Sequence, residues 1–464
     1  MTPGAIMFLL DVVWVLLVWP VVLAGLLPAR FTLLHASASG IEAALLFPAA
    51  QLLFLYALGL YRREAILDPA KALTRLPVAS ALAAFSAVVV GKMLARLVAD
   101  WPEPADGTLL FSAAFLCLGG CAVLARLVFR LLRRQRLMRT HLLVVGAGAR
   151  AWDLVWMLRK EGRNLSYEIT CLHDPSFGSL DPRWADDPRV QVVPLTDSIL
   201  AEARRLQASD IVVAPDERRG MALEALLDCK AEGFVVEQYL SFVEREIRRV
   251  DIKRMELSWF LYSDGFQANA LDRVAKRMLD IAVSLVILTL ASPFLLLAIA
   301  ALLFDDGWPI LYRQTRVTAG QRPFQIFKLR TMRRNAEAGG AVWAAAGDSR
   351  ITPVGRFLRR SRLDELPQLF NVLRGEMALV GPRPERPEFV CELAAQIPLY
   401  NQRHRVKAGL TGWAQVNYPY GASVDDARSK LSYDLYYVKN YSIWFDLRVL
   451  VQTLRVVLWP SGVR

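Results

Sequence analysis

The sequence predicts an α/β membrane protein in three parts: an N-terminal four-helix transmembrane bundle (1–135), a Rossmann-like α/β middle domain (136–265), and an α-rich cytoplasmic domain (270–464) that begins with a re-entrant membrane helix hairpin. Three observations predict this. Apolar residues make up 54% of the 464 residues and charged residues only 22%, which favours membrane segments. Strand-like runs alternate with helical stretches in the middle of the chain. A further long apolar segment carries basic residues on both flanks.

Four apolar stretches in the first third of the chain predict the transmembrane bundle. They cover residues 6–27, 41–60, 78–99 and 109–132. Each has about the 20 residues that a helix needs to cross the hydrocarbon core of a bilayer. The first stretch lacks a basic region before it and a clear cleavage site after it, so we interpret it as a retained span and not as a signal peptide.

The distribution of charge predicts the orientation of the bundle. Basic residues follow the second and fourth stretches, namely Arg62, Arg63, Lys71, Arg75, Arg133, Arg134, Arg136 and Arg139, whereas the loop 100–107 is acidic. The positive-inside rule therefore predicts that both ends of the bundle lie in the cytoplasm. Ionisable residues inside the stretches are Asp11, Lys92 and Arg96. Such residues are often functional, but pairing between helices or snorkelling explains them at least as well.

The middle domain begins with a glycine turn between a predicted strand and a predicted helix. Gly146 and Gly148 fit the pattern G-x-G-x-x-A, in which backbone N–H groups at a helix N-terminus face a phosphate. Asp174 ends the second predicted strand, where it would meet a ribose. The later runs YEITCL, VQVVP, DIVVAP and FVVEQ predict further strands. A domain of this kind that binds nothing and mediates assembly is an equally good interpretation.

Residues 278–304 form an apolar segment long enough to cross the membrane, yet both of its flanks are basic. A crossing helix would place one basic cluster outside, against the positive-inside rule. Ser292-Pro293 lies at its middle, where proline removes a backbone hydrogen bond and a serine hydroxyl satisfies a freed carbonyl. We therefore predict a hairpin that enters and leaves by the cytoplasmic face. The alternative is a fifth, kinked crossing.

The C-terminal segment 444–459 is a second candidate for membrane contact. Arg448, Gln452 and Arg455 fall on one helical stripe, and apolar residues and tryptophans surround it. A helix of this pattern lies in the membrane interface or packs on its own domain.

Adjacent carboxylates lie among arginines in the last domain. Ser361 is placed like a helix N-cap, so Asp364 and Glu365 are predicted at the exposed start of a helix. The apolar face of that helix would comprise Leu363, Leu366, Leu369, Phe370 and Leu373, and the nearby arginines are Arg356, Arg359, Arg360, Arg362 and Arg383. One carboxylate suits attack on phosphorus and the other suits Mg²⁺. The plainer alternative is that both complement a helix dipole.

From about residue 270 onward the chain resembles the bacterial sugar transferase family, the monotopic polyprenyl-phosphate phosphoglycosyl transferases. The resemblance rests on Ser292-Pro293, YRQ-x-RV at 312–317, K-x-RTM at 328–332, LDELPQL-x-NVL at 363–373, VGPRPE at 380–385 and GLTGWAQVN at 409–417. The part before residue 270 is similar, in architecture more than in motif, to the large members of this family.

The resemblance implies the following reaction. Asp364 attacks the β-phosphorus of a UDP-sugar and expels UMP, and undecaprenyl phosphate then takes the phosphosugar, with Mg²⁺ required. Asp364 and Glu365 are the implied catalytic and metal-binding pair. The phosphate-binding residues are expected to be Arg359, Arg383, Lys328 and Arg330.

The resemblance also implies a setting for the enzyme. It places the protein in the bacterial inner membrane with its catalytic domain on the cytoplasmic face, at the start of exopolysaccharide, capsule or O-antigen synthesis. The first two domains would serve dimer formation or nucleotide sensing.

The chain departs from the family pattern at four positions. Arg362 and Ala378 stand where serine is usual, Thr318 where glycine is usual, and Ala408 where proline is usual. None of these touches the dyad, but Thr318 and Ala408 leave the local loop geometry open.

Other functions compete with this one. The net charge of +12 also suits nucleic acid, but the arginines cluster beside membrane segments and carboxylates, so no nucleic-acid partner is expected. A glycosyltransferase that attacks the sugar carbon would release UDP instead of UMP. A membrane scaffold or nucleotide sensor would use the Gly146–Gly148 turn and would not need Asp364. No motif identifies the sugar.

Overall fold

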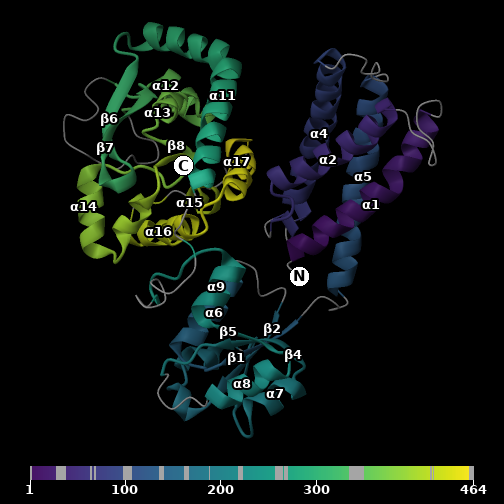
Figure 1. Cartoon of the computed structure of the whole chain (residues 1–464), viewed down its shortest axis with the longest axis vertical. Helices are drawn as coiled ribbons and strands as arrows, with labels where there is room; N and C mark the ends of the chain where they lie inside the picture. Colours follow the sequence, from purple (N-terminus) through teal and green to yellow (C-terminus); the bar gives the residue numbers. More distant parts are fainter. Residues whose placement is uncertain are drawn as a thin grey trace. The chain divides into compact units, whose positions relative to one another are not determined.

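A computed structural model describes residues 3–27, 38–62, 65–66, 69–97, 107–134, 140–160, 167–187, 189–217, 223–255, 265, 270–333, 350–418, 421 and 423–458. The chain forms two compact units, Met1–Ile247 and Arg248–Arg464. The first unit contains a helical bundle and a parallel sheet, and the second contains the residues around the predicted dyad (Figure 1).

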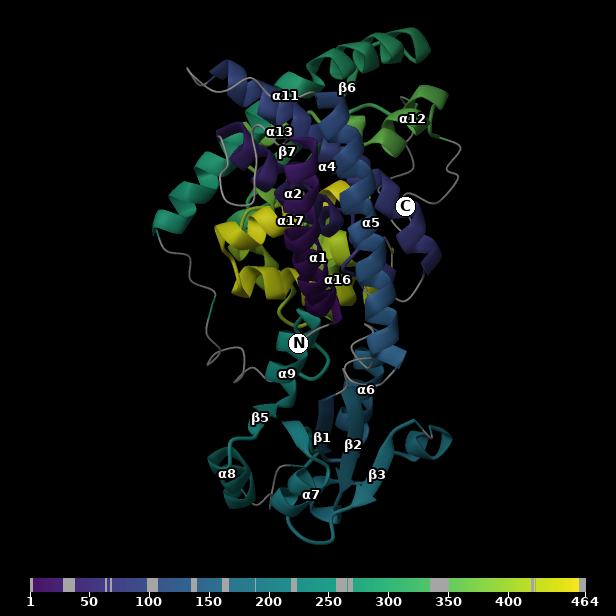
Figure 2. The ribbon, with the colours of Figure 1, turned by 90° about the vertical axis from the view of Figure 1, so that its right-hand side faces the viewer.

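The helical bundle confirms the four predicted apolar helices. They are α1 (Pro3–Leu26), α2 (Ala38–Ala57), α4 (Pro69–Leu97) and α5 (Gly107–Arg134). Figures 1 and 2 show them side by side. In α1, α4 and α5 the apolar segments are long enough to cross a membrane, whereas that of α2, Ala43–Ala57, is shorter. The bundle core is apolar, and its most buried large side chains include Trp19, Leu23 and Phe47.

The three ionisable residues inside the bundle differ in burial. Asp11 on α1 is fully buried and pairs with Arg126 on α5, Oδ1 to Nη1, at 3.3 Å. Lys92 and Arg96 are not buried and lie at the surface of α4. Asp11 thus has the interhelical partner that the plainer interpretation required. The predicted cytoplasmic charges of Arg136 and Arg139, and most of the acidic loop 100–107, lie outside the described residues.

The middle domain is a five-stranded, fully parallel sheet in the order β3-β2-β1-β4-β5. Every run predicted as a strand forms one: β1 (Thr140–Val145), β2 (Tyr167–His173), β3 (Gln191–Pro194), β4 (Ala208–Val213) and β5 (Val235–Gln238). The helices are α6 (Ala149–Lys160), α7 (Ile199–Arg205), α8 (Leu223–Ala231) and α9 (Tyr239–Ile247). Figure 1 shows α6 and α9 on one face of the sheet and α7 and α8 on the other.

The second unit begins at Arg248, earlier than the predicted 270. Its first residues pack on the predicted catalytic domain: Val250 N donates to Ser432 O at 3.0 Å, and Trp413 Nε1 donates to Arg248 O at 2.8 Å. The unit's helices are α11 (Ala270–Asp305), α12 (Pro353–Ser361), α13 (Gln368–Arg374), α14 (Pro387–Gln396), α15 (Trp413–Asn417), α16 (Val424–Lys439) and α17 (Ile443–Leu458).

Short strands and 3₁₀ turns complete this unit. The strands are β6 (Leu311–Val317), β7 (Pro323–Leu329), β8 (Ala378–Val380) and β9 (Gly409–Thr411). The antiparallel pair β6–β7 and the parallel pair β8–β9 are separate two-stranded sheets. The C-terminal helix α17 packs on the domain through buried Phe445 and Val449, although Trp444 is 78% exposed.

The segment predicted as a hairpin is a single 36-residue helix, α11, with Pro293 inside it. Ser292 Oγ donates to Thr289 O at 2.8 Å. That carbonyl is the one that loses its backbone donor at Pro293, so the serine has its predicted role. The ribbon of α11 changes direction along its length (Figure 1). Large apolar side chains are exposed along it, including Leu290, Leu296 and Leu297.

Candidate active site

The dyad lies in a turn between two helices, not at a helix N-cap as predicted. Ser361 is the last residue of α12, and its Oγ donates to Phe357 O and Leu358 O. Arg362 follows in the left-handed conformation (φ 61°), Asp364 and Glu365 occupy a 3₁₀ turn (Leu363–Glu365), and α13 starts only at Gln368. The prediction was wrong because the left-handed residue ends one helix before the carboxylates, and sequence spacing does not report that break.

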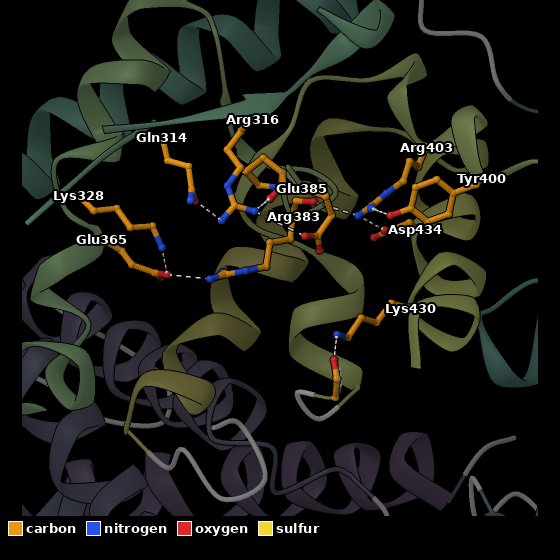
Figure 3. Close-up of polar contacts among 12 residues, drawn as sticks. Gln314, Arg316, Lys328, Glu365, Arg383, Glu385, Tyr400, Arg403, Lys430 and Asp434 are labelled. Atoms are coloured by element: carbon orange, nitrogen blue, oxygen red, sulfur yellow. Dashed lines mark hydrogen bonds and ion pairs between the residues drawn. The ribbon is translucent and has the colours of Figure 1, made fainter. Parts of the chain in front are cut away.

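Glu365 is surrounded by three cations from separate stretches of the chain, and Figure 3 shows two of them, Lys328 and Arg383. Its Oε1 accepts from Lys328 Nζ on β7 at 3.2 Å and from Arg383 Nη2 at 3.0 Å. Arg362 Nη1 lies 3.9 Å from Oε2. Burial acts to raise the pKa of Glu365, but these three positive charges hold that pKa well below its usual range. Glu365 is therefore a fixed negative charge at neutral pH.

Asp364 is buried, with 7% of its surface exposed, which corrects the predicted exposed position. Its Oδ1 has no hydrogen-bond partner among the residues that the structure describes. Burial, followed by the neighbouring charge of Glu365, raises the pKa of Asp364 to about 6. The carboxylate is thus ionised at neutral pH and retains one uncommitted oxygen. Of the predicted apolar face, Leu369 is buried, whereas Phe370 is 49% exposed.

The other two predicted phosphate-binding arginines, Arg359 and Arg330, have different hydrogen-bond partners. Arg359 Nε donates to Thr331 Oγ1 at 2.8 Å, and the charge of Arg359 acts to lower the pKa of Asp364. Arg330 Nη2 instead donates to Asp306 O and Gly307 O, at the end of α11. The structure thus brings Lys328 and Arg383 onto the dyad and places Arg330 against the membrane helix.

Sequence reasoning missed a buried ion pair behind Arg383. Arg403 Nη2 and Asp434 Oδ2 are 2.8 Å apart, and both side chains are almost fully buried. Burial raises the pKa of Asp434 to about 6 despite the opposing charge of Arg403. The available signal was Asp434 itself, an acidic residue within the otherwise apolar run YDLYYV of a helix.

The dyad supplies the donor chemistry that Mg²⁺ requires. Protein sites usually hold Mg²⁺ through one or two carboxylates together with waters and substrate phosphates. The uncommitted Oδ1 of Asp364 fits that pattern, and Glu365 adds a second carboxylate beside it. Within the described ranges no cluster of three or more histidine, cysteine or acidic side chains offers a complete metal site.

The glycine turn belongs to the other compact unit, and a carboxylate of the chain itself occupies it. Ala149 N and Arg150 N, at the start of α6, donate to Asp216 Oδ2 and Oδ1 at 2.6 and 2.9 Å. Gly146 is in a conformation that favours glycine (φ 114°), and a Cβ on Gly148 would clash with Asp216 Oδ2. Asp174 accepts from Ser176 N, two residues away.

Residues 271–460 match the model of the family described as bacterial sugar transferase. The chain is 43% identical over 189 residues to UDP-N-acetylgalactosamine-undecaprenyl-phosphate N-acetylgalactosaminephosphotransferase of Aeromonas hydrophila (41% of this chain, 45% of the relative). It is 42% identical over 185 residues to UDP-glucose:undecaprenyl-phosphate glucose-1-phosphate transferase of Caulobacter vibrioides (39% of this chain, 69% of the relative).

A relative from Escherichia coli (strain K12), also named UDP-glucose:undecaprenyl-phosphate glucose-1-phosphate transferase, is 37% identical over 308 residues (64% of each chain). That match is longer than the second unit, so the similarity continues into the first. The match to the Aeromonas relative spans less than half of that protein's length. On the family match and these identities, the chain belongs to the bacterial sugar transferase family.

Proposed function

We propose that this protein transfers a sugar 1-phosphate from a UDP-sugar to undecaprenyl phosphate, with Asp364 as the nucleophile. An Asp364 oxygen attacks the β-phosphorus, the bond to the bridging oxygen breaks, and UMP leaves with the electron pair. A phosphate oxygen of the lipid then attacks the same phosphorus and restores the carboxylate. The observation that carries the proposal is the buried Asp364 Oδ1 without a described partner, beside the cation-held Glu365. The names of the relatives support the donor and acceptor classes.

The cations around the dyad would stabilise the negative charge on the phosphate groups of the donor. Lys328 and Arg383 already face Glu365, and guanidinium groups match phosphate oxygens in a bidentate manner. Arg359 is close enough to influence Asp364. Arg330 has the weakest support, because its guanidinium is held at the end of α11.

We include Mg²⁺ in the proposal, held by Asp364 and Glu365 together with the donor phosphates. When bound, it would neutralise negative charge on the pyrophosphate. The residues of the chain perform the remaining tasks: Asp364 attacks, Glu365 fixes the local charge, and Lys328 and Arg383 orient the phosphates.

The membrane helix α11 is proposed to enter and leave the bilayer on the cytoplasmic face, where the catalytic domain lies. Both of its ends contact the same compact unit. Near one end, Lys276 Nζ donates to Val380 O at 3.1 Å, and at the other end Arg330 donates to Asp306 and Gly307. A straight helix of 36 residues would be about 54 Å long, far more than the hydrocarbon core.

Cysteine labelling tests this topology. In a cysteine-free variant, Leu271→Cys and Trp308→Cys mark the two ends of α11, where both native side chains are exposed. An impermeant maleimide should label both positions in inverted membrane vesicles and neither in intact spheroplasts. Labelling of the two positions from opposite sides would establish a crossing helix and refute the re-entrant arrangement.

The reaction is tested with protein in nanodiscs supplied with Mg²⁺, undecaprenyl phosphate and a panel of UDP-glucose, UDP-galactose and their N-acetylated counterparts. We expect UMP release with one sugar and none from Asp364→Asn. Without the lipid acceptor, one UMP per enzyme should appear, together with a phosphosugar mass increment on the peptide that contains Asp364. Release of UDP would move the attack to the sugar carbon and refute the proposed mechanism.

A further inference from the structure

The Arg383–Glu385 turn is held by three donors on three consecutive carbonyl groups. Arg403 Nη2 donates to Arg383 O at 3.0 Å, Arg316 Nη1 to Pro384 O at 3.1 Å, and Val317 N to Glu385 O at 3.0 Å. Figure 3 shows Arg316 and Arg403 on either side of Arg383 and Glu385. The turn therefore has little freedom to shift, and the Arg383 side chain starts from a fixed backbone.

Of these donors, Arg403 is buried and bonds three different acceptors. It lies in the 3₁₀ turn Tyr400–Arg405, with 6% of its side chain exposed. Besides the Arg383 carbonyl, its guanidinium contacts the Tyr400 hydroxyl at 2.6 Å and the Asp434 carboxylate at 2.8 Å. Asp434 belongs to α16, so the arginine ties the turn to a helix that supplies no residue to the dyad.

We propose that Arg403, anchored by Asp434, is a positioning residue that acts on the reaction through Arg383. Arg403 holds the Arg383 backbone, and the Arg383 guanidinium holds Glu365 Oε1 at 3.0 Å. Arg403 itself has no described contact with Asp364 or Glu365, so its influence on the dyad must pass through Arg383. The inference rests on the proposed function, in which Arg383 orients the donor phosphates.

Burial alone does not require an arginine at this position. A buried ion pair contributes little net stability compared with an apolar replacement, because desolvation offsets the attraction. The guanidinium here uses its fork to serve three acceptors, and one of them is the backbone of the residue that reaches the dyad. Lysine would keep the charge opposite Asp434 but would lack this planar geometry.

A double-mutant cycle tests the inference. UMP release is measured for the wild type, Arg403→Lys, Arg383→Lys and the double variant. We expect Arg403→Lys to lower kcat by about 10- to 100-fold, because misplacement by about 1 Å costs that much, and to change KM less. In the Arg383→Lys background, the same substitution should change kcat by less than about twofold. An equal loss in both backgrounds would overturn the inference.

The Val390→Ala variant is a control that distinguishes a loss of stability from a loss of Arg383 positioning. Val390 is buried in the apolar cluster that also contains Tyr400, and its side chain has no polar atom that could bond the polar groups above. It should lower Tm and leave kcat within about twofold. A loss of kcat in Val390→Ala equal to that in Arg403→Lys would attribute the effect of Arg403 to stability.

A structure of the Arg403→Lys variant gives a readout that does not depend on activity. We expect the contact between Arg383 Nη2 and Glu365 Oε1 to be lost. Its persistence would overturn the inference even if UMP release were confirmed. Conversely, failure of the wild-type protein to release UMP would refute the proposed function, and the structure of the variant would still decide whether Arg403 positions Arg383.

Discussion

The proposed catalytic dyad and the glycine turn are both positions where the sequence predicts phosphate contact and the structure has a carboxylate, but the carboxylates differ in their partners. At the glycine turn, both oxygens of Asp216 accept hydrogen bonds from backbone amides at the start of α6. At the dyad, Glu365 is held by side-chain cations, and Asp364 Oδ1 has no partner among the described residues.

Under the proposed function, this difference separates the region that reacts from the region that does not. Backbone amides at a helix N-terminus are fixed donors, and Asp216 satisfies them in the way that an N-cap side chain does. A phosphate would have to displace a carboxylate there. At the dyad, Lys328 and Arg383 already pair with the Glu365 carboxylate, and the proposed nucleophile Asp364 has an oxygen from which no described hydrogen-bond donor need be displaced. A glycine fingerprint alone therefore predicts less than an uncommitted carboxylate among cations.

The largest effect is expected from Asp364→Asn. An amide of the same shape cannot form the acyl phosphate, so UMP release should fall by at least about 10³-fold. Quantifying the nucleotide released in nanodiscs checks this. Substantial residual turnover would mean that the uncommitted oxygen is not the nucleophile and would remove the contrast with Asp216.

The pH profile of Glu365→Gln should sharpen the contrast further. Asp364 must be ionised to attack, and because its pKa is raised to about 6, wild-type kcat/KM should fall as the pH drops below about 6. Removing the negative charge of Glu365 makes ionisation of Asp364 easier, so the acidic limb should move to lower pH.

The same Glu365→Gln substitution should lower kcat by about 10²-fold, because Lys328 and Arg383 lose the negative charge that holds them in place. The profile is measured in matched buffers between pH 4 and 8. An acidic limb that stays at the same pH or moves to higher pH would show that Glu365 does not act electrostatically on Asp364.

A smaller effect, on stability alone, is expected at the glycine turn. Asp216→Ala removes the cap from Ala149 N and Arg150 N and should cost about 1 kcal/mol of unfolding free energy. UMP release should stay within about twofold of the wild type. The neighbouring exposed Glu217 provides the matched control, Glu217→Ala. A large loss of turnover in Asp216→Ala alone would show that the turn takes part in the reaction.

The smallest expected effect is the coupling between two departures from the family pattern, Thr318 and Ala408, which contact each other. Thr318 Oγ1 accepts from Ala408 N at 3.1 Å and donates to Glu376 O at 2.8 Å. Proline at 408 would have no N–H to donate. Thr318→Ala should lower the free energy of unfolding by about 1 kcal/mol. In an Ala408→Pro background, the same substitution should lower it by several tenths of a kcal/mol less. Thermal unfolding of the four proteins measures this coupling, and strict additivity would contradict it.

Local sequence patterns predicted the helices and strands of the first unit and the types of residue in the candidate site. Apolar length predicted the four bundle helices, and alternating patterns predicted all five parallel strands, because these signals are local. The Ser292–Thr289 hydrogen bond could also be predicted from the sequence, since it joins residues one helical turn apart. The motifs alone pointed to Asp364, Glu365, Lys328 and Arg383.

Which of these groups meet, and how deeply they are buried, depends on the tertiary fold. It brought Lys328 and Arg383 to one oxygen of Glu365, placed Arg330 at the end of α11, and paired Arg403 with Asp434. It also buried Asp364 and assigned Asp216 to the glycine turn. Side-chain partners and desolvation depend on residues distant in sequence, which composition, spacing and periodicity do not report.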